Sequence, residues 1–253
     1  SLLENANNEL VQKAQAEGNL ALGYTCYHVP EALLNVGNCF SVRLRAPHTG
    51  SIDIATYYMS NYTCEFARAL VERGIEGGYQ FLDAMIGVDA CSMMNRAMEH
   101  FEILKVNDKP NFFVTHCDIP YKITDYTLDS YVKQMRIHVL DKLTEVYGVD
   151  TSDAAIRQAV AEHNEVCSIV SEMAEMRKAE NPVITGYEFH VINLVTYVCP
   201  KALILPYLRE TLKELKKRKP DEKSPFRARV AIVGSEIDDP QLTKLIEGCG
   251  ALV

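Results

Sequence analysis

Short apolar runs alternate with amphipathic stretches along the first half of the chain. Helical patterns cover residues 64–73 and 91–104, and a shorter helix begins after Pro30 and stops at Gly37. Between these patterns the chain has apolar runs of strand length, at residues 20–24, 39–44, 81–88 and 111–115. Strands that alternate with helices in this way predict an α/β domain with a parallel sheet and crossover helices.

The second half of the chain is helical over longer stretches. Helices are predicted at residues 127–147, 152–178, 186–198 and 201–219. A lysine-rich linker ending at Pro220 and Pro225 leads to an apolar run at 228–233, which predicts a buried strand. Asp238 and Asp239 then predict the N-cap of a helix that opens at Pro240.

These patterns predict three parts of the chain. An N-terminal α/β domain occupies residues 1–125, a helical section with a linker occupies 126–224, and a second α/β domain begins at 225–253. The second domain is expected to be incomplete, because the pattern stops within a predicted strand at Val253.

Composition narrows the class of protein. The 253 residues are 47% hydrophobic and 24% charged, which is typical of a folded globular chain rather than a disordered or fibrous one. No apolar run approaches the roughly 18 residues of a membrane-spanning helix, and the first residues lack the features of a secretory signal. The net charge of −8 argues against nucleic-acid binding. We therefore expect a cytoplasmic protein.

Eight cysteines are the unusual part of the composition. They are scattered along the chain without a CxxC pair, so neither a disulfide scaffold nor a zinc ribbon is predicted. Four of them follow predicted strands, precede predicted helices, or do both: Cys26, Cys64, Cys91 and Cys117. Ligands of open α/β sheets gather beyond the carboxyl ends of the strands, and a helix N-terminus favours a thiolate. These four thiols could therefore converge on an iron–sulfur cluster.

Burial as small apolar side chains is the alternative interpretation for every cysteine, since free cysteine is among the most buried residue types. We prefer that interpretation for the remaining four, at positions 39, 167, 199 and 249.

Five motifs, in order along nearly the whole chain, carry a resemblance to a known family. They are Gly23-Tyr-Thr-Cys26-Tyr-His-Val-Pro-Glu31, Cys64-Glu-Phe-Ala-Arg68, Gly87-Val-Asp-Ala-Cys91-Ser92, Asn181-Pro-Val-Ile-Thr-Gly186-Tyr-Glu188 and Gly234-Ser-Glu-Ile-Asp-Asp-Pro240. The set resembles the 2-hydroxyacyl-CoA dehydratase and benzoyl-CoA reductase family, in particular its D-component-like subunits. The resemblance implies flavodoxin-like α/β domains with helical additions, and paired homologous subunits.

The resemblance also implies a [4Fe-4S] cluster held by three cysteines in each subunit. Cys64 and Cys91 match the first two ligands. The third lies, in the family, just beyond the strand that here ends at Val253, so we expect a chain truncated in its C-terminal domain. Cys26 matches a position that could supply a further ligand.

The reaction implied by the resemblance is the elimination of water from an (R)-2-hydroxyacyl-CoA through a ketyl radical, in an oxygen-sensitive enzyme. An ATP-dependent iron–sulfur activator protein would inject the electron, and a homologous second subunit would complete the enzyme. Two alternatives remain open. One is reduction of an aromatic acyl-CoA, or another ATP-dependent reduction through a double cluster, and the other is a non-catalytic partner subunit that lacks its own cluster.

Several further side chains are candidates for chemistry near the thiols. His28 and Glu31 are the predicted acid–base residues, since both follow Cys26 at the ligand-binding edge. A loop histidine and a carboxylate that favours the helix dipole are the respective alternatives. Arg43 and Arg45 could bind a phosphate of coenzyme A, but solvated strand-face charges are the preferred interpretation. Three tyrosines are interpreted as packing rather than pocket residues: Tyr57, Tyr58 and Tyr62.

Overall fold

The computed structural model describes residues 1–47, 49–220, 226–234 and 237–253. Within these ranges the chain forms two compact units, residues 1–161 with 198–200, and residues 162–197 with 201–253. The limits predicted at residues 125 and 224 remain a prediction. No helix in the described ranges is both long enough and apolar enough to span a lipid bilayer.

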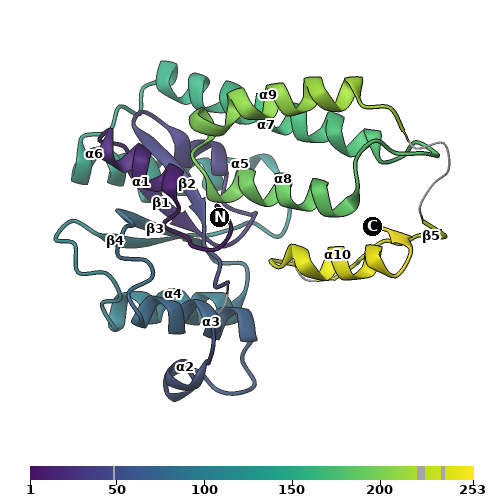
Figure 1. Ribbon diagram of the computed structural model, residues 1–253. Coiled ribbons are helices and arrows are strands. Elements are labelled where there is room, and N and C mark those ends of the chain that lie inside the picture. The colour runs from purple at the N-terminus through teal and green to yellow at the C-terminus, as the bar shows by residue number, and fades with distance from the viewer. Residues whose placement is uncertain (48, 221–225, 235–236) are drawn as a thin grey trace. The chain divides into compact units, whose positions relative to one another are not determined.

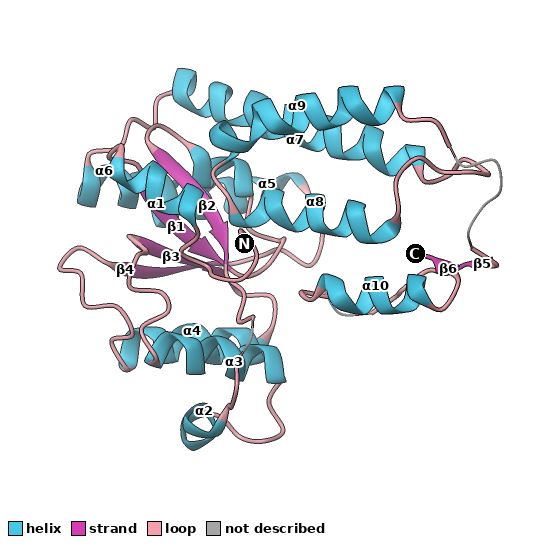
Figure 2. Cartoon of the chain, in the orientation of Figure 1, coloured by secondary structure: helices cyan, strands magenta, loops and turns pink. Residues whose placement is uncertain are grey.

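Four parallel strands form the centre of the first unit (Figures 1 and 2). They are β1 (Leu20–Tyr24), β2 (Cys39–Arg43), β3 (Ala84–Val88) and β4 (Phe113–Cys117), and their spatial order is β2-β1-β3-β4. This is the order of the first four strands in a flavodoxin-like 2-1-3-4-5 sheet, so the predicted α/β fold class is confirmed. Tyr24 lies opposite both Arg43 and Ile86, which brings the carboxyl ends of the strands to one edge.

Helices cover both faces of this sheet (Figure 1). On one face lie α3 (Glu65–Ile75) and α4 (Ser92–Ile103), and on the other lies a continuous helical run made of α5 (Asp125–Met135), the π-helical turn η2 (Arg136–Leu140) and α6 (Asp141–Tyr147). The unit also contains α1 (Glu9–Ala16), the 3-10 helix η1 (Glu31–Asn35), α2 (Asp53–Tyr58) and the start of α7 (Asp153–Met176). The helix predicted at 127–147 is thus confirmed.

Successive side chains of the strands enter different cores. Leu22 and Ile86 pack in one cluster with Val139 and Leu143 of the helical run. On the opposite face α4 lies so close to β3 that a Cβ on Gly87 would come within 2.8 Å of Met98 Cε. A larger residue at position 87 would therefore displace the end of the Met98 side chain, and glycine avoids that displacement.

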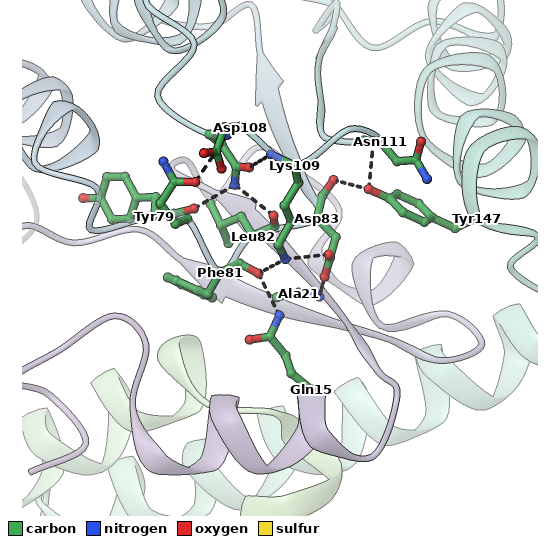
Figure 3. A network of polar contacts seen from close by, with 12 residues as sticks. Gln15, Ala21, Tyr79, Phe81, Leu82, Asp83, Asp108, Lys109, Asn111 and Tyr147 are labelled. Carbon is green, nitrogen blue, oxygen red and sulfur yellow. Dashed lines mark hydrogen bonds and ion pairs between the residues drawn. The ribbon is translucent and has the colours of Figure 1, made fainter.

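The amino-terminal edge of the sheet is closed by a polar network (Figure 3). The Asp83 carboxylate accepts hydrogen bonds from Ala21 N and from Lys109 Nζ, each at 2.8 Å. The Tyr147 hydroxyl lies 2.8 Å from the carbonyl oxygens of both Asp83 and Asn111. The network therefore ties the starts of β1, β3 and β4 to α6.

Two local predictions in this unit were wrong. Residues 53–58 form α2, a helix that the sequence pattern did not predict, and the Glu72 carboxylate on α3 accepts a hydrogen bond from Ala55 N at 2.6 Å. This helix depends on a tertiary contact, which the local sequence does not encode. His116 and Cys117 belong to β4 instead of following it.

The described residues of the second unit form helices and one pair of short strands. Its elements are α8 (Gly186–Val198), α9 (Lys201–Lys217), β5 (Ala228–Arg229), α10 (Pro240–Gly248) and β6 (Ala251–Leu252), together with α7 from residue 162 onward. The predicted N-cap is confirmed, because the Asp239 side chain accepts a hydrogen bond from Gln241 N at 2.8 Å. Pro225, Ser235 and Glu236 lie outside the described residues.

The buried strand predicted at 228–233 is wrong in its burial and its length. Ala228 and Arg229 pair with β6 and are both exposed. The apolar sequence led to the expectation of a strand covered on both faces, as in larger parallel sheets. A two-residue ladder with one neighbouring strand does not provide that cover.

The motif Asn181–Glu188 forms the N-terminus of α8. Thr185 and Glu188 make a reciprocal capping box, in which Thr185 Oγ1 accepts from Glu188 N at 3.0 Å and Glu188 Oε2 accepts from Thr185 N at 2.9 Å. The Glu247 carboxylate on α10 accepts from Gly186 N at 2.7 Å and from Tyr187 N at 3.0 Å. These contacts give the motif a structural role within the second unit.

Candidate functional site

Two of the predicted ligands lie at the starts of neighbouring helices at the carboxyl edge of the sheet. Cys64 is the N-cap residue of α3, and Cys91 is the N-cap residue of α4. Both side chains are exposed. The positive end of a helix dipole favours the thiolate, which is the form of cysteine that binds metals. Their predicted place in the fold is confirmed, and their role as ligands remains a prediction.

A thioether contact joins these two helix starts. Cys64 N donates a hydrogen bond to Met93 Sδ at 3.2 Å, and Met93 lies two residues after Cys91. Met93 was not predicted as a site residue, because a methionine in the first turn of a helix carries no distinctive signal.

Cys26 lies at the same edge in different surroundings. It follows β1 by two residues and is half-buried beside the core cluster. The helix predicted after Pro30 is the short 3-10 helix η1, which starts five residues beyond Cys26. The prediction that Cys26 precedes a helix N-terminus was therefore wrong, because residues 26–29 first form a turn in which Val29 N donates to Cys26 O at 3.1 Å.

A buried cation lies between the segments that carry Cys26 and Cys64. Arg43 ends β2 and is 1% exposed, and its guanidinium carbon lies 5.4 Å from the ring centroid of Tyr27 and 6.0 Å from that of Phe66. Tyr27 adjoins Cys26, and Phe66 is two residues after Cys64. Arg43 thus contacts both thiol-bearing segments through cation–π interactions.

The interpretation of Arg43 and Arg45 as solvated charges was wrong. Both side chains are buried, and Arg45 Nη1 donates to Leu3 O at 3.0 Å. All five residues of β2 are buried, although it is an edge strand, because other segments of the chain cover it. The alternating sequence pattern of the strand does not predict that cover.

The two predicted acid–base residues differ in their exposure. His28 is exposed, and its backbone oxygen accepts a hydrogen bond from the Tyr131 hydroxyl at 3.1 Å. Glu31 is buried, and Ser41 Oγ on β2 donates to Glu31 Oε1 at 2.8 Å. The structure therefore fixes the Glu31 carboxylate against β2 and leaves the His28 ring accessible to solvent.

Burial separates the other cysteines from the exposed pair. Burial raises the pKa of Cys39 to about 12, with a smaller contribution from Asp83, and raises the pKa of Cys117 to about 11. Cys117 packs within the apolar core cluster, whereas Cys64 and Cys91 are exposed. The packing interpretation is confirmed for Cys39 and Cys199, which are buried, and is wrong for Cys167 and Cys249, which are exposed.

The packing interpretation of the tyrosine cluster was also wrong. Tyr57 on α2 is 88% exposed, Tyr62 in the following loop is 93% exposed, and Tyr58 is 46% exposed. These side chains lie on the segment that leads into Cys64. They therefore form exposed aromatic surface on α2 and the loop that follows it.

The donor set fits an iron–sulfur cluster in kind but not in number. Cys64 and Cys91 supply two exposed soft ligands at positively polarised helix ends. Across residues 1–47, 49–220, 226–234 and 237–253, His, Cys, Asp and Glu side chains form no group of three or more placed to hold a metal ion. A cluster at this edge would need ligands in addition to these two thiols.

Comparison with known proteins relates this chain to an enzyme family. A family model described as 2-hydroxyglutaryl-CoA dehydratase, D-component, matches residues 26–253. The chain is 19% identical over 247 residues to the (R)-phenyllactyl-CoA dehydratase beta subunit of Clostridium sporogenes, a match that covers 97% of this chain and 64% of that protein.

Two further relatives are similar at the same level. The beta subunit of (R)-2-hydroxyglutaryl-CoA dehydratase from Acidaminococcus fermentans is 21% identical over 208 residues, which cover 81% of this chain and 54% of the relative. A benzoyl-CoA reductase subunit from Thauera aromatica is 19% identical over 238 residues, which cover 90% of this chain and 59% of the relative. The chain thus spans between 54% and 64% of the length of these curated relatives.

Proposed function

This chain belongs to the 2-hydroxyglutaryl-CoA dehydratase D-component family, and we propose that it acts as an iron–sulfur subunit of an (R)-2-hydroxyacyl-CoA dehydratase, a hydro-lyase. The observation that carries the proposal is the pair of exposed thiols, Cys64 and Cys91, at the N-termini of two adjacent helices. Two such thiols at the carboxyl edge of a parallel sheet lie where ligands of α/β proteins bind.

We assign Cys64 and Cys91 as ligands of a [4Fe-4S] cluster and Cys26 as a candidate for a further ligand. The N-termini of α3 and α4 would offset part of the negative charge of a thiolate-bound cluster. When bound, the cluster would supply the single electron that turns the thioester carbonyl into a ketyl radical, from which the α-hydroxyl departs.

Two side chains of this chain are proposed for proton transfer. The exposed His28 is accessible to a substrate at the same edge, where its imidazole could act as a base for the acidified β-proton. Glu31 is the second candidate, with its carboxylate held by the Ser41 hydroxyl.

The relatives are named as subunits, which supports a homologous second subunit as a partner. We further propose an ATP-dependent iron–sulfur activator protein as the electron donor and an acyl-CoA as the substrate. The enzyme would be sensitive to oxygen and would act in the cytoplasm.

The proposal is tested on the full-length protein purified without oxygen together with its partner subunit. About four iron atoms and four sulfides per chain are expected, and Cys64→Ala and Cys91→Ala should each abolish their retention. Cys167→Ala, which alters another exposed thiol, is the matched control. Less than about one iron per wild-type chain after reconstitution would overturn the cluster assignment.

A reductase is the second candidate function, because the benzoyl-CoA reductase subunit is as similar to this chain as the phenyllactyl-CoA dehydratase subunit is, at 19% identity each. Assays of the activated complex with a 2-hydroxyacyl-CoA and with an aromatic acyl-CoA distinguish the two. Dehydration without ring reduction supports the first proposal, and ring reduction without dehydration supports the second.

A non-catalytic partner subunit that lacks its own cluster is the third candidate, since the relatives are named as subunits of their enzymes. Unchanged turnover in a complex carrying both Cys64→Ala and Cys91→Ala would establish this role and contradict the first two.

A further inference from the structure

The peptide group that precedes Cys64 is hydrogen-bonded at both of its ends. Its oxygen, Thr63 O, accepts from Arg68 Nε at 3.2 Å, and its N–H, on Cys64, donates to Met93 Sδ at 3.2 Å. The Cys64 carbonyl oxygen accepts in turn from Arg68 N at 3.1 Å. Both peptide planes that flank the Cys64 Cα are therefore fixed, and the thiol can change its direction mainly by rotation about χ1.

Arg68 also holds the segment that leads into Cys64. Its Nη1 lies 3.5 Å from Thr56 Oγ1 and 3.4 Å from Asn61 Oδ1, so one guanidinium contacts three points between residues 56 and 63. One turn later on the same helix face, Glu72 accepts from Ala55 N at 2.6 Å. The two side chains are 6% and 3% exposed. Together they fasten α2 and its following loop to α3.

A buried arginine costs free energy of desolvation, and an apolar side chain of similar size would fill the same space at a lower cost. The planar guanidinium group of arginine, unlike an apolar side chain, can donate hydrogen bonds to several acceptors in one fixed geometry. At position 68 one of those acceptors is Thr63 O, which belongs to the peptide group that precedes Cys64, a candidate ligand.

We propose that Arg68 and Met93 are positioning residues for Cys64, which set the direction of its thiol relative to Cys91. Arg68 fixes the Thr63 carbonyl from within α3, and Met93 fixes the Cys64 amide from α4, the helix that begins after Cys91. This inference rests on the proposed function for the identity of the ligand, a metal cluster, and does not rest on it for the positioning itself.

The first test uses a nearly isosteric pair of variants, Met93→Leu and Met94→Leu, in the full-length apo protein. Met93→Leu removes the sulfur acceptor and should raise the hydrogen-exchange rate of the Cys64 amide about fivefold. Met94→Leu makes the same chemical change one residue along α4 and should leave that rate unchanged. Equal exchange of the Cys64 amide in the two variants would overturn the role of Met93.

The second test replaces Arg68 with lysine, which keeps the charge but lacks the fork of donors. Arg68→Lys should raise exchange across residues 61–64 about tenfold, while exchange in the sheet core stays within about twofold. Asn61→Ala removes a single exposed acceptor of Arg68 from the loop and should give a smaller rise in exchange at the same amides. Because this substitution is on the surface, its effect is not attributable to general misfolding, which Arg68→Lys alone could cause. Unchanged exchange in both variants would overturn the role of Arg68.

The third test reads the reconstituted cluster by electron paramagnetic resonance. Met93→Leu and Arg68→Lys should alter the g-values of the reduced cluster and shorten its half-life under chelator about tenfold, whereas Met94→Leu should not. Identical spectra and half-lives in all variants would overturn positioning at the cluster. If wild-type protein holds no iron, the proposed function fails, and the exchange results alone decide whether Cys64 is positioned.

Discussion

The two edges of the four-stranded sheet differ in the exposure of Cys39 and of the pair Cys64 and Cys91, while Cys117, which ends β4, is buried at the carboxyl edge. At the amino edge the Cys39 thiol is buried, with its pKa raised to about 12, beside the network of Asp83, Lys109 and Tyr147. At the carboxyl edge the Cys64 and Cys91 thiols are exposed at helix N-termini.

The difference shows that side-chain contacts stabilise the amino edge of the sheet, whereas groups at the carboxyl edge are available for chemistry. At the amino edge, hydrogen bonds from side chains join three strand starts to one helix, so the polar groups there have partners within the protein (Figure 3). At the carboxyl edge, parallel topology turns the helix N-termini outward beside the ends of strands, and their donors and dipoles face a prospective ligand. Four predictions test this difference between the two edges.

The largest expected difference is in thiol reactivity. In folded apo protein, Cys64 and Cys91 should react with iodoacetamide at least about a thousandfold faster than Cys39 and Cys117, since the buried thiols react only after an opening that costs several kcal/mol. Timed alkylation followed by peptide mass spectrometry measures the rates. Comparable labelling of Cys39 and Cys64 under native conditions would remove the contrast between the edges.

The next effect concerns the carboxylate at the centre of the amino-edge network. Asp83→Ala should lower the free energy of unfolding by about 3 kcal/mol, because it leaves the buried Ala21 N–H without its acceptor and removes the carboxylate that pairs with the Lys109 ammonium, which keeps only Phe81 O as a partner. Urea denaturation measures the loss. Asp118→Ala, which changes an exposed carboxylate just after β4, is the control and should cost less than about 0.5 kcal/mol. Equal losses would mean that stability is not concentrated at the amino edge.

The sequence predicted the thiols of the carboxyl edge better than the contacts that support them. Strand–helix alternation placed Cys64 and Cys91 at helix starts, because the N-terminal ends of these helices follow directly from apolar periodicity. It did not predict α2, whose six residues are held by Glu72 from a different helix. Contacts of this kind depend on residues that are distant in sequence, and they leave no local pattern.

Burial was the property that the sequence predicted least well. Arg43 and Arg45 are arginines on an alternating strand, which is typical of a solvated face, yet both are buried. Tyr57 and Tyr62 are large aromatic residues, which are typical of a core, yet both are exposed. In each case tertiary packing decides whether another segment of the chain covers the side chain, and composition does not encode that packing.

The third prediction concerns alkaline pH and acts through the buried thiols. The folded-state pKa of Cys39 is raised from an ordinary value of 9.0 to about 12, so above pH 9 the unfolded chain loses a proton that the folded chain keeps. Stability should therefore be constant below pH 9 and fall as the pH rises toward 12, by on the order of 2 kcal/mol from Cys39 alone near pH 10.5.

Urea denaturation at a series of pH values from 7 to 10.5 measures this slope. Cys39→Ala should roughly halve it, because the Cys117 thiol, whose pKa is raised from 9.0 to about 11, also loses a proton on unfolding over this range, whereas Cys64→Ala, at the exposed edge, should leave it as in the wild type. A slope that does not change in Cys39→Ala would show that the amino-edge thiol is not the group that links folding to alkaline pH.

The smallest expected effect separates one hydroxyl from the rest of the network. Tyr147→Phe keeps the ring beside Phe113 but removes the hydroxyl that lies 2.8 Å from the carbonyl oxygens of Asp83 and Asn111, so it should cost about 1 kcal/mol. Tyr62→Phe removes a hydroxyl from an exposed ring near the opposite edge and should cost nothing measurable. Both values come from urea denaturation at neutral pH. If the two substitutions cost the same, hydrogen bonds at the amino edge stabilise the fold no more than contacts with water do, and the stability of that edge would lie in its apolar packing.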